Sequence, residues 1–242
     1  MCYNVAYIEK RGERVAKHYG ATFQTEIEFD EKYHVSGFSH PDLFVITCQQ
    51  PQYIQPYRWG LIPKWVKDEQ QANELSVQTL NAKAETVFEK PSFRNSIANK
   101  RCIVIVNGFY EWRTVGKKKY PYYIHLKAQD FFSLGGIYEN WVNKSTGELM
   151  NTFSIITVEA NPLLQKIHNS KKRMPLIIPV EKEKEWIKSD LSKTGIQSLM
   201  LPFDENKMEA YTISKLITDR TQHNNVPEVM HRFEYPELEL LE

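Results

Sequence analysis

The stretch RCIVIVNGFYEWR (residues 101–113) joins an uninterrupted apolar run to a polar, aromatic motif across Asn107 and Gly108. A short run rich in β-branched residues that ends at Asn and Gly is typical of a buried strand followed by a turn. Similar apolar runs occur at residues 43–47, 122–126, 131–138, 153–158 and 175–179. Helical patterns lie between some of these runs but do not alternate with them regularly. The sequence therefore predicts an α+β fold with a mainly antiparallel core, and not a doubly wound parallel sheet.

Helix boundaries are clearest at NPLLQKIHN, where Asn161 can cap a helix and Pro162 can occupy its first position. The sequence STGE (145–148) has the composition of a hairpin turn. Further helices are predicted around residues 10–18, ended by Gly20, around residues 70–80, and in the segment that carries Trp186.

The chain of 242 residues has no internal repeat and no linker rich in Gly, Ser or Pro. It is long enough to bury a full core without disulfides or metal ions. We therefore expect a single domain over residues 1–228, followed by a loose, acidic C-terminal tail over residues 229–242.

The net charge is +1, so the composition alone does not indicate a nucleic-acid-binding protein. The distribution of charge is more informative. Residues 90–119 contain eight Lys and Arg side chains and one acidic residue, Glu111, and a second basic group follows at residues 166–173. These segments could form a basic face that binds nucleic acid, or they could be separately solvated lysines.

The three cysteines do not have the spacing of a metal site or of a disulfide framework. Cys48 and Cys102 lie in apolar strand-like runs, where a cysteine packs as a small hydrophobic residue. The first twenty residues lack the apolar core of a signal peptide, and no stretch has the length of a membrane span. We expect a reducing, cytoplasmic environment and no membrane association.

Glu111 and His168 are candidates for proton transfer. Glu111 follows a strand and stands between Tyr110 and Trp112, where desolvation would raise the pKa of its carboxyl group. His168 follows a predicted helix, whose C-terminal end would make the imidazole more basic. The alternatives are a surface ion pair for Glu111 and a structural role for His168.

Two further motifs contain candidate binding residues. NAKAET (81–86) offers Asn81 for a hydrogen bond to a substrate and Lys83 for a phosphate, unless it is an ordinary solvated turn. RWGLIPKW (58–65) places Trp59 and Trp65 around a Gly- and Pro-containing loop. Such Trp side chains can stack on the bases of a single strand, or they can pack in the core.

Cys2 directly follows the initiator methionine. Removal of Met1, which is favoured by a small second residue, would leave a cysteine with a free α-amine. In reference peptides the pKa is roughly 7.7–8.0 for an α-amine and roughly 8.5 for a thiol, so both are partly nucleophilic at neutral pH. Such a cysteine can capture an aldehyde twice, first as an imine and then as a five-membered thiazolidine, because the second attack is intramolecular. The alternative is a cysteine without a role.

Together these motifs resemble the SOS response-associated peptidase (SRAP) family of abasic-site processing proteins. No single motif is decisive, but their order along the chain is specific. The matching segments are Cys2, RWGLIPKW (58–65), NAKAET (81–86), PSFR (91–94), NGFYEWR (107–113), FFSLGGIYENW (131–141), FSIITVEAN (153–161), IHNSKKRMPLII (167–178) and NNVPE (224–228).

The resemblance implies a barrel-like β core flanked by short helices, and covalent crosslinking to abasic sites in single-stranded DNA. Cys2 would be the nucleophile through its amine and thiol, and Asn81 would position the Cys2 amine or the sugar. Glu111 would transfer protons during imine formation and ring closure, and His168 would donate the proton that opens the deoxyribose ring. Phosphates and separated bases would contact Lys83, Arg94, Arg173, Trp65 and Trp59.

The resemblance implies no metal and no organic cofactor. It also implies a monomer that associates with the nucleoid when bound to DNA, whereas its protein partners at replication forks stay undefined. Two other functions are open. One is a Cys-dependent peptidase acting on itself or a partner, and the other is a non-catalytic single-strand binder in which Cys2 has no role.

The chain departs from the family pattern at two places. Lys83 stands where the family more often has Arg, which keeps a phosphate contact but loses bidentate geometry. The link from His168 to Arg173 contains four residues (169–172) and is longer than the usual H-x-R-M-P. This puts the role of Arg173 in question and offers Lys171 and Lys172 as further phosphate contacts.

Overall fold

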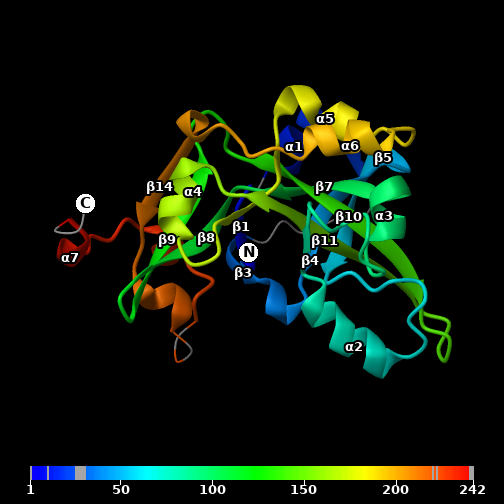
Figure 1. The fold of residues 1–242 in the computed structure, drawn as a ribbon, viewed down its shortest axis with the longest axis horizontal. Coiled ribbons are helices and arrows are strands. Elements are labelled where there is room, and N and C mark those ends of the chain that lie inside the picture. Colours follow the sequence, from blue (N-terminus) through cyan, green and yellow to red (C-terminus); the bar gives the residue numbers. More distant parts are fainter. Residues whose placement is uncertain (1, 10, 25–30, 220, 222, 240–242) are drawn as a thin grey trace.

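Five strands form a closed barrel in the computed structural model, which describes residues 2–9, 11–24, 31–219, 221 and 223–239. Four neighbouring pairs are antiparallel, and β5 closes the barrel by pairing in parallel with β11. The strands are, in order, β11 (Leu149–Glu159), β10 (Phe132–Val142), β7 (Arg101–Val106), β4 (Asp42–Thr47) and β5 (Gln50–Trp59). The predicted α+β fold with a barrel-like, mainly antiparallel core is confirmed (Figure 1).

Short strands extend the barrel sheet at its edges. β6 (Asn81–Lys83) pairs in parallel with β11, and β12 (Arg173–Pro175) pairs with the end of the same strand. β11 therefore holds the NAKAET motif beside the segment that follows His168. The other additions are β2 (Thr22–Phe23) on β5 and β13 (Ile177–Ile178) on β10.

A second sheet of five strands packs against the barrel and contains the second half of the run 101–113. Its order is β14 (Met208–Thr212), β9 (Lys118–Leu126), β8 (Gly108–Val115), β1 (Asn4–Tyr7) and β3 (Lys32–Ser36). The run 101–113 thus divides between two sheets, because β7 belongs to the barrel and β8 to the second sheet. The turn at Asn107 and Gly108 marks the change of sheet.

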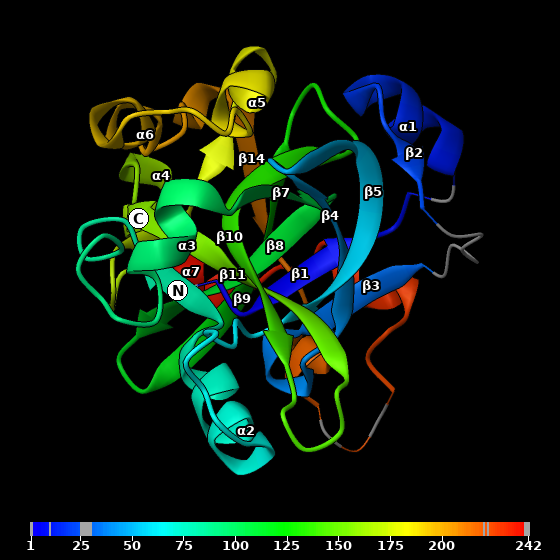
Figure 2. The same cartoon turned by 90° about the vertical axis from the view of Figure 1, so that its right-hand side faces the viewer.

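The helices lie around the outside of the two sheets (Figures 1 and 2). The predicted caps are confirmed: the Asn161 side chain accepts a hydrogen bond from the Leu164 backbone, and Gly20 ends the first helix with a positive φ of 62°. The helices are α1 (Gly12–Tyr19), α2 (Glu69–Gln78), α3 (Arg94–Asn99), α4 (Pro162–Ile167), α5 (Val180–Trp186), α6 (Lys193–Leu199) and α7 (Pro236–Glu239).

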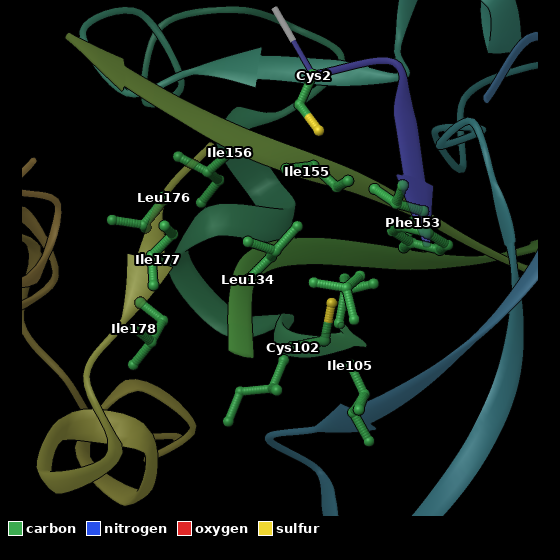
Figure 3. Packing of buried hydrophobic residues seen from close by; sticks show 14 of the residues in the cluster. Cys2, Cys102, Ile105, Leu134, Phe153, Ile155, Ile156, Leu176, Ile177 and Ile178 are labelled. Atoms are coloured by element: carbon green, nitrogen blue, oxygen red, sulfur yellow. The ribbon is translucent and has the colours of Figure 1, made fainter. Parts of the chain in front are cut away.

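The main core fills the barrel and continues beneath the N-terminal segment. Figure 3 shows the Cys2 side chain pointing into this cluster beside Ile155, with Cys102 deeper in the same cluster. All three cysteines are buried free thiols, and Cys48 and Cys102 are core residues as predicted.

The residues after 228 do not form a loose tail as far as Glu239. Val229 and Leu238 are buried, and the Tyr235 hydroxyl donates a hydrogen bond to the Ile213 carbonyl oxygen. The Tyr235 ring packs on Tyr120, with the ring centroids 5.0 Å apart. The expectation of a loose tail fails for residues 229–239 because this segment is held against β9 and β14, through the Tyr235–Tyr120 contact and a hydrogen bond from the Phe233 amide to the Thr212 carbonyl oxygen. The last three positions of the expected tail, residues 240–242, lie outside the described residues.

Among the described residues, no helix combines the length and apolar character that a membrane crossing needs.

Candidate active site around Cys2

Cys2 lies two residues before the start of β1, and its side chain is fully buried. β1 pairs antiparallel with β8, with Val5 opposite Phe109 and Ala6 opposite Gly108. Continuing this register toward the N-terminus brings the first residues of the chain alongside Glu111. The β1–β8 ladder therefore unites two motifs that are more than a hundred positions apart in the sequence.

Asn81 contacts Cys2 from the barrel side. β6 holds Asn81 opposite Ile155 of β11, and its Nδ2 donates a hydrogen bond of 2.8 Å to the Cys2 carbonyl oxygen. The other side-chain atom, Oδ1, is buried and has no hydrogen-bond partner within the part of the chain that the structure describes. Because a buried amide oxygen is costly to leave unpaired, Oδ1 is available to a substrate or to an amine.

The Glu111 carboxyl group lies in a desolvated position. Burial raises its pKa to about 8, so it is mostly protonated at neutral pH. The thiol of Cys2 is affected in the same way, because burial raises its pKa well above the ordinary value and Glu111, where it is ionised, adds to the shift. The site thus holds a neutral thiol beside a carboxyl group that is ready to exchange a proton near neutral pH.

His168 follows α4 and joins the same cluster. Its Nδ1 donates a hydrogen bond of 2.8 Å to the Arg173 carbonyl oxygen and is 3.6 Å from Glu111 Oε1. Since a carbonyl oxygen can only accept, the proton of the neutral ring is on Nδ1, and Nε2 carries the lone pair. Burial, with a smaller contribution from the positive charges of Lys171 and Arg173, lowers the pKa of His168 to about 4. The expectation that the helix end would make this histidine more basic is therefore wrong, because desolvation outweighs it.

Arg173 lies beside the cluster, and its guanidinium group is already paired. It donates to Glu85 at 2.6 Å through Nη1 and to the Thr157 carbonyl oxygen through Nη2. A phosphate would have to share Arg173 with Glu85 or replace that carboxylate. Lys83 and Arg94 are both exposed, which leaves their side chains accessible to a backbone phosphate.

The two tryptophans of RWGLIPKW have different environments. Trp65 is 47% exposed, whereas Trp59 is 0% exposed and donates to the Leu80 carbonyl oxygen. The Trp59 ring is stacked with that of Phe153 inside the barrel. Stacking of Trp59 on a DNA base is incompatible with this position, so the core-packing alternative holds for Trp59. The ring of Trp65 is exposed and so is accessible to a base.

The sequence did not reveal three neighbours of the site. Tyr3 and Lys119 line the pocket next to Glu111 and His168, and Phe38, which is 56% exposed, packs on Tyr3 with ring centroids 4.9 Å apart. None of them lies in a motif. Tyr3 precedes β1, Phe38 lies in the 3-10 helix Gly37–Ser39 and Lys119 lies in β9. Only the pairing of β1, β8 and β9 brings Tyr3 and Lys119 to the pocket.

In the described part of the chain, no three His, Cys, Asp or Glu side chains converge to hold a metal ion. The described polar groups around Cys2 are instead an amide, a protonated carboxyl group and a neutral imidazole. Such a set can orient a nucleophile and move protons without charging the buried site. The barrel and this cluster define a protein with a single cysteine-centred site near its N-terminus.

Comparison with known proteins shows the family to which this chain belongs. The sequence model of the family described as SOS response associated peptidase (SRAP) matches residues 1–220, and the chain belongs to this family. The abasic site processing protein YoqW of Bacillus subtilis (strain 168) is 39% identical over 210 residues, which cover 86% of this chain and 89% of YoqW. The abasic site processing protein HMCES of Xenopus tropicalis is 28% identical and is matched over 55% of its own length, by 72% of this chain.

Solved structures agree with this assignment. A crystal structure of a protein from Bacteroides thetaiotaomicron superposes with a TM-score of 0.89 at 42% sequence identity. The match covers 96% of this chain and 100% of that one. The predicted family is therefore confirmed.

Proposed function

We propose that this protein captures abasic sites in single-stranded DNA by forming a thiazolidine with Cys2 after Met1 has been removed. The proposal rests on one observation above all. A cysteine at the second position is buried among Asn81, Glu111 and His168 in a family whose curated relatives are named for processing abasic sites. The abasic sugar in its ring-opened form supplies the aldehyde.

The chemistry balances without a cofactor. The α-amine of Cys2 adds to the aldehyde carbon, and loss of one water gives an imine. The thiol then adds to the imine carbon, and its proton passes to the nitrogen, which closes the five-membered ring. The net reaction converts an aldehyde and an N-terminal cysteine into a thiazolidine and water.

Glu111 is the better proton donor of the two candidates. With a pKa of about 8 it is protonated at neutral pH and can protonate the departing hydroxyl of the carbinolamine or the ring oxygen of the sugar. His168, with a pKa of about 4, is neutral and can accept a proton at Nε2. We therefore assign the ring-opening proton to Glu111 and not to His168. Asn81 would fix the backbone of Cys2 while both nucleophiles react.

The protonation states favour this reaction over peptidase chemistry. A cysteine peptidase needs a thiolate, which a neighbouring imidazolium usually stabilises. Here the pKa of the Cys2 thiol is raised and that of His168 is lowered, so both groups are neutral at pH 7. An amine that attacks first does not need the thiolate, because the thiol adds afterwards within the same residue.

The proposed function also includes the partner, the oligomeric state and the location of the protein. We propose that the partner is single-stranded DNA containing abasic sites and that the protein acts as a monomer. It would work in the cytoplasm, at the nucleoid. A non-catalytic single-strand binder would share the DNA partner but would not need the buried cluster.

The test is incubation with single-stranded DNA containing one abasic site, followed by denaturation and mass spectrometry. Protein that lacks Met1 should give a heat-stable adduct with the mass of the thiazolidine. Cys2→Ala keeps a free amine but has no thiol, so it should give only an imine that borohydride can trap, with some strand cleavage by β-elimination. Cys48→Ala is the matched control, because it removes another buried thiol and should crosslink normally.

Protein that retains Met1 separates the mechanisms. Its Cys2 nitrogen is an amide, so no thiazolidine should form and the Met1 amine gives at most a reversible imine, whereas a thiol-dependent peptidase would keep its activity. A stable adduct from protein shown by mass to retain Met1 would exclude the thiazolidine mechanism.

A further inference from the structure

The loop between His168 and Arg173 is closed by its own backbone. The amides of Lys171 and Lys172 both donate to the His168 carbonyl oxygen, at 3.2 Å and 2.8 Å. Lys172 takes a positive φ of 50°, a conformation that a non-glycine residue adopts only where the surrounding structure holds it. The Lys172 carbonyl oxygen in turn accepts from the Ala160 amide. The four-residue link is thus a compact turn.

Asn169 fixes this turn to β8. The Thr114 amide donates to Asn169 Oδ1 at 3.0 Å, and Asn169 Nδ2 donates to the Thr114 carbonyl oxygen at 2.7 Å. An Asn side chain offers one acceptor and two donors, so it can pair with a strand edge as another strand would. These two hydrogen bonds hold Ser170 and Lys171 at the open edge of β8.

The β8–β9 register brings a second lysine to the same place. Thr114 is paired with Lys119, and directly opposed residues of an antiparallel pair share one face of the sheet. Thr114, Lys119, Ser170 and Lys171 all line one pocket of about 400 Å³, together with Glu111 and His168. The lysines are exposed, while Glu111 and His168 are buried.

The lining matches the chemistry of a phosphate group. Two lysines from separate elements, Lys119 and Lys171, line the pocket together with the hydroxyl-bearing residues Ser170 and Thr218. Among the described residues that line it, Glu111 is the one carboxyl group, and it belongs to the reaction site. Lysine binds phosphate as a point charge, so the two side chains need no fixed bidentate geometry.

We infer that this pocket is a subsite for one DNA phosphate next to the abasic sugar, with Lys171 and Lys119 as its cationic groups and Asn169 as the residue that positions Lys171. The inference rests on the proposed function, since it assigns the substrate geometry of the same site. Because Glu111 and His168 line the same pocket, a phosphate bound there would hold the adjoining sugar close to the groups that surround Cys2.

The experiment measures equilibrium binding of single-stranded DNA that carries a tetrahydrofuran abasic analogue, which cannot crosslink. Lys171→Ala should weaken binding about 5–10-fold and reduce the slope of log K against log salt by about 0.7, the value for one lost phosphate contact. Lys166→Ala is the matched control: it removes an exposed lysine from α4 that lines a different pocket. Asn169→Ala should reproduce part of the loss without removing a charge.

The phosphate itself is located with single methylphosphonate substitutions on either side of the lesion. One position should weaken wild-type binding and have a clearly smaller effect on Lys171→Ala, in which only Lys119 is left to contact the phosphate. Oligonucleotides that end at the lesion with or without a terminal phosphate distinguish an internal phosphodiester from a strand end. Equal affinities for Lys171→Ala and Lys166→Ala, or additive losses at every methylphosphonate, would overturn the inference. Because binding is measured without the covalent step, failure of the crosslinking proposal would leave this result interpretable.

Discussion

Asn81 Nδ2 donates a hydrogen bond of 2.8 Å to the carbonyl oxygen of Cys2. A side chain of the barrel sheet thus orients the backbone of Cys2, two residues before β1. The hydrogen bond favours one orientation of the Cys2 carbonyl group. It also places the buried Asn81 Oδ1 beside the position where a substrate or amine would lie.

Asn81→Ala should therefore slow crosslinking more than it weakens binding. Loss of the orienting hydrogen bond is expected to reduce the crosslinking rate at least 10-fold, because small displacements of a nucleophile are costly. Affinity for intact single-stranded DNA should be nearly unchanged. Quenched time courses with abasic DNA give the rate, and Asn73→Ala on exposed α2 is the control. Normal kinetics for Asn81→Ala would remove Asn81 from the mechanism.

Glu111→Gln should stabilise the protein, and increasingly so as the pH rises. The pKa of Glu111 is about 8 in the folded protein, and that of a free glutamate is roughly 4.3. Between these values the folded state holds a proton that the unfolded chain has released, so the stability of the wild type falls with rising pH. Each pH unit in this window costs up to about 1.4 kcal/mol, and glutamine avoids the cost.

Thermal unfolding at pH 5, 6, 7 and 8 checks this prediction. The difference in Tm between Glu111→Gln and the wild type should be small at pH 5 and largest at pH 8. Glu148→Gln changes an exposed glutamate in the β10–β11 hairpin and should show no such trend. A constant difference at all four pH values would mean that Glu111 is ionised in the folded protein.

The local features of the fold could be predicted from the sequence, but the closure of the barrel could not. The run 101–113 indicated β7 and the start of β8, and Asn161 indicated the start of α4, because strand runs and caps are properties of neighbouring residues. The pairing of Arg58 with Thr152, which closes the barrel, leaves no periodic pattern in either segment.

In the candidate site, too, the local motifs could be predicted from the sequence, but the effects of distant segments could not. Motifs indicated which residues belong together, but the protonation of His168 depends on burial by segments that are distant in the sequence. The same is true of Trp59 and Trp65, since the sequence of their loop does not show which ring points inward. Lys119 belongs to the basic segment 90–119 that the sequence indicated, but its place beside Glu111 could not be predicted, because only the β8–β9 register brings it to the site.

The pH dependence of crosslinking should depend on Glu111 and not on His168. His168 stays neutral from pH 5 to pH 8, because burial lowers its pKa to about 4. His168→Gln should reduce the rate, within the roughly 10²–10⁴-fold range of general acid–base groups, without changing the shape of the profile. Glu111→Gln should remove a fall in rate near pH 8. An inflection near pH 6.5 that disappears in His168→Gln would instead restore His168 as the proton donor.

Trp65→Ala and Trp59→Phe should separate DNA binding from stability. Trp65 is 47% exposed, so its loss should weaken binding of intact single strands by about 1–3 kcal/mol, the typical contribution of one stacked base. Its Tm should change little. Trp59→Phe removes the hydrogen bond to the Leu80 carbonyl oxygen in the core and should lower the Tm, with normal DNA binding at temperatures where it is folded. Fluorescence anisotropy and thermal unfolding report the two effects, and full affinity in Trp65→Ala would exclude stacking on this ring.

Arg94→Glu should weaken binding to intact and abasic single strands alike. Arg94 is exposed at the start of α3, where its guanidinium group is accessible to a backbone phosphate. Phosphate contacts carry no sequence information and release counterions, so the loss should be similar for all sequences and largest at low salt. Lys207→Glu makes a similar charge change at an exposed residue directly before β14, in a different part of the fold from α3, and should have a smaller effect. If Arg94→Glu and Lys207→Glu bound equally well across a salt titration, the face that contains Arg94 would not be the DNA-binding face.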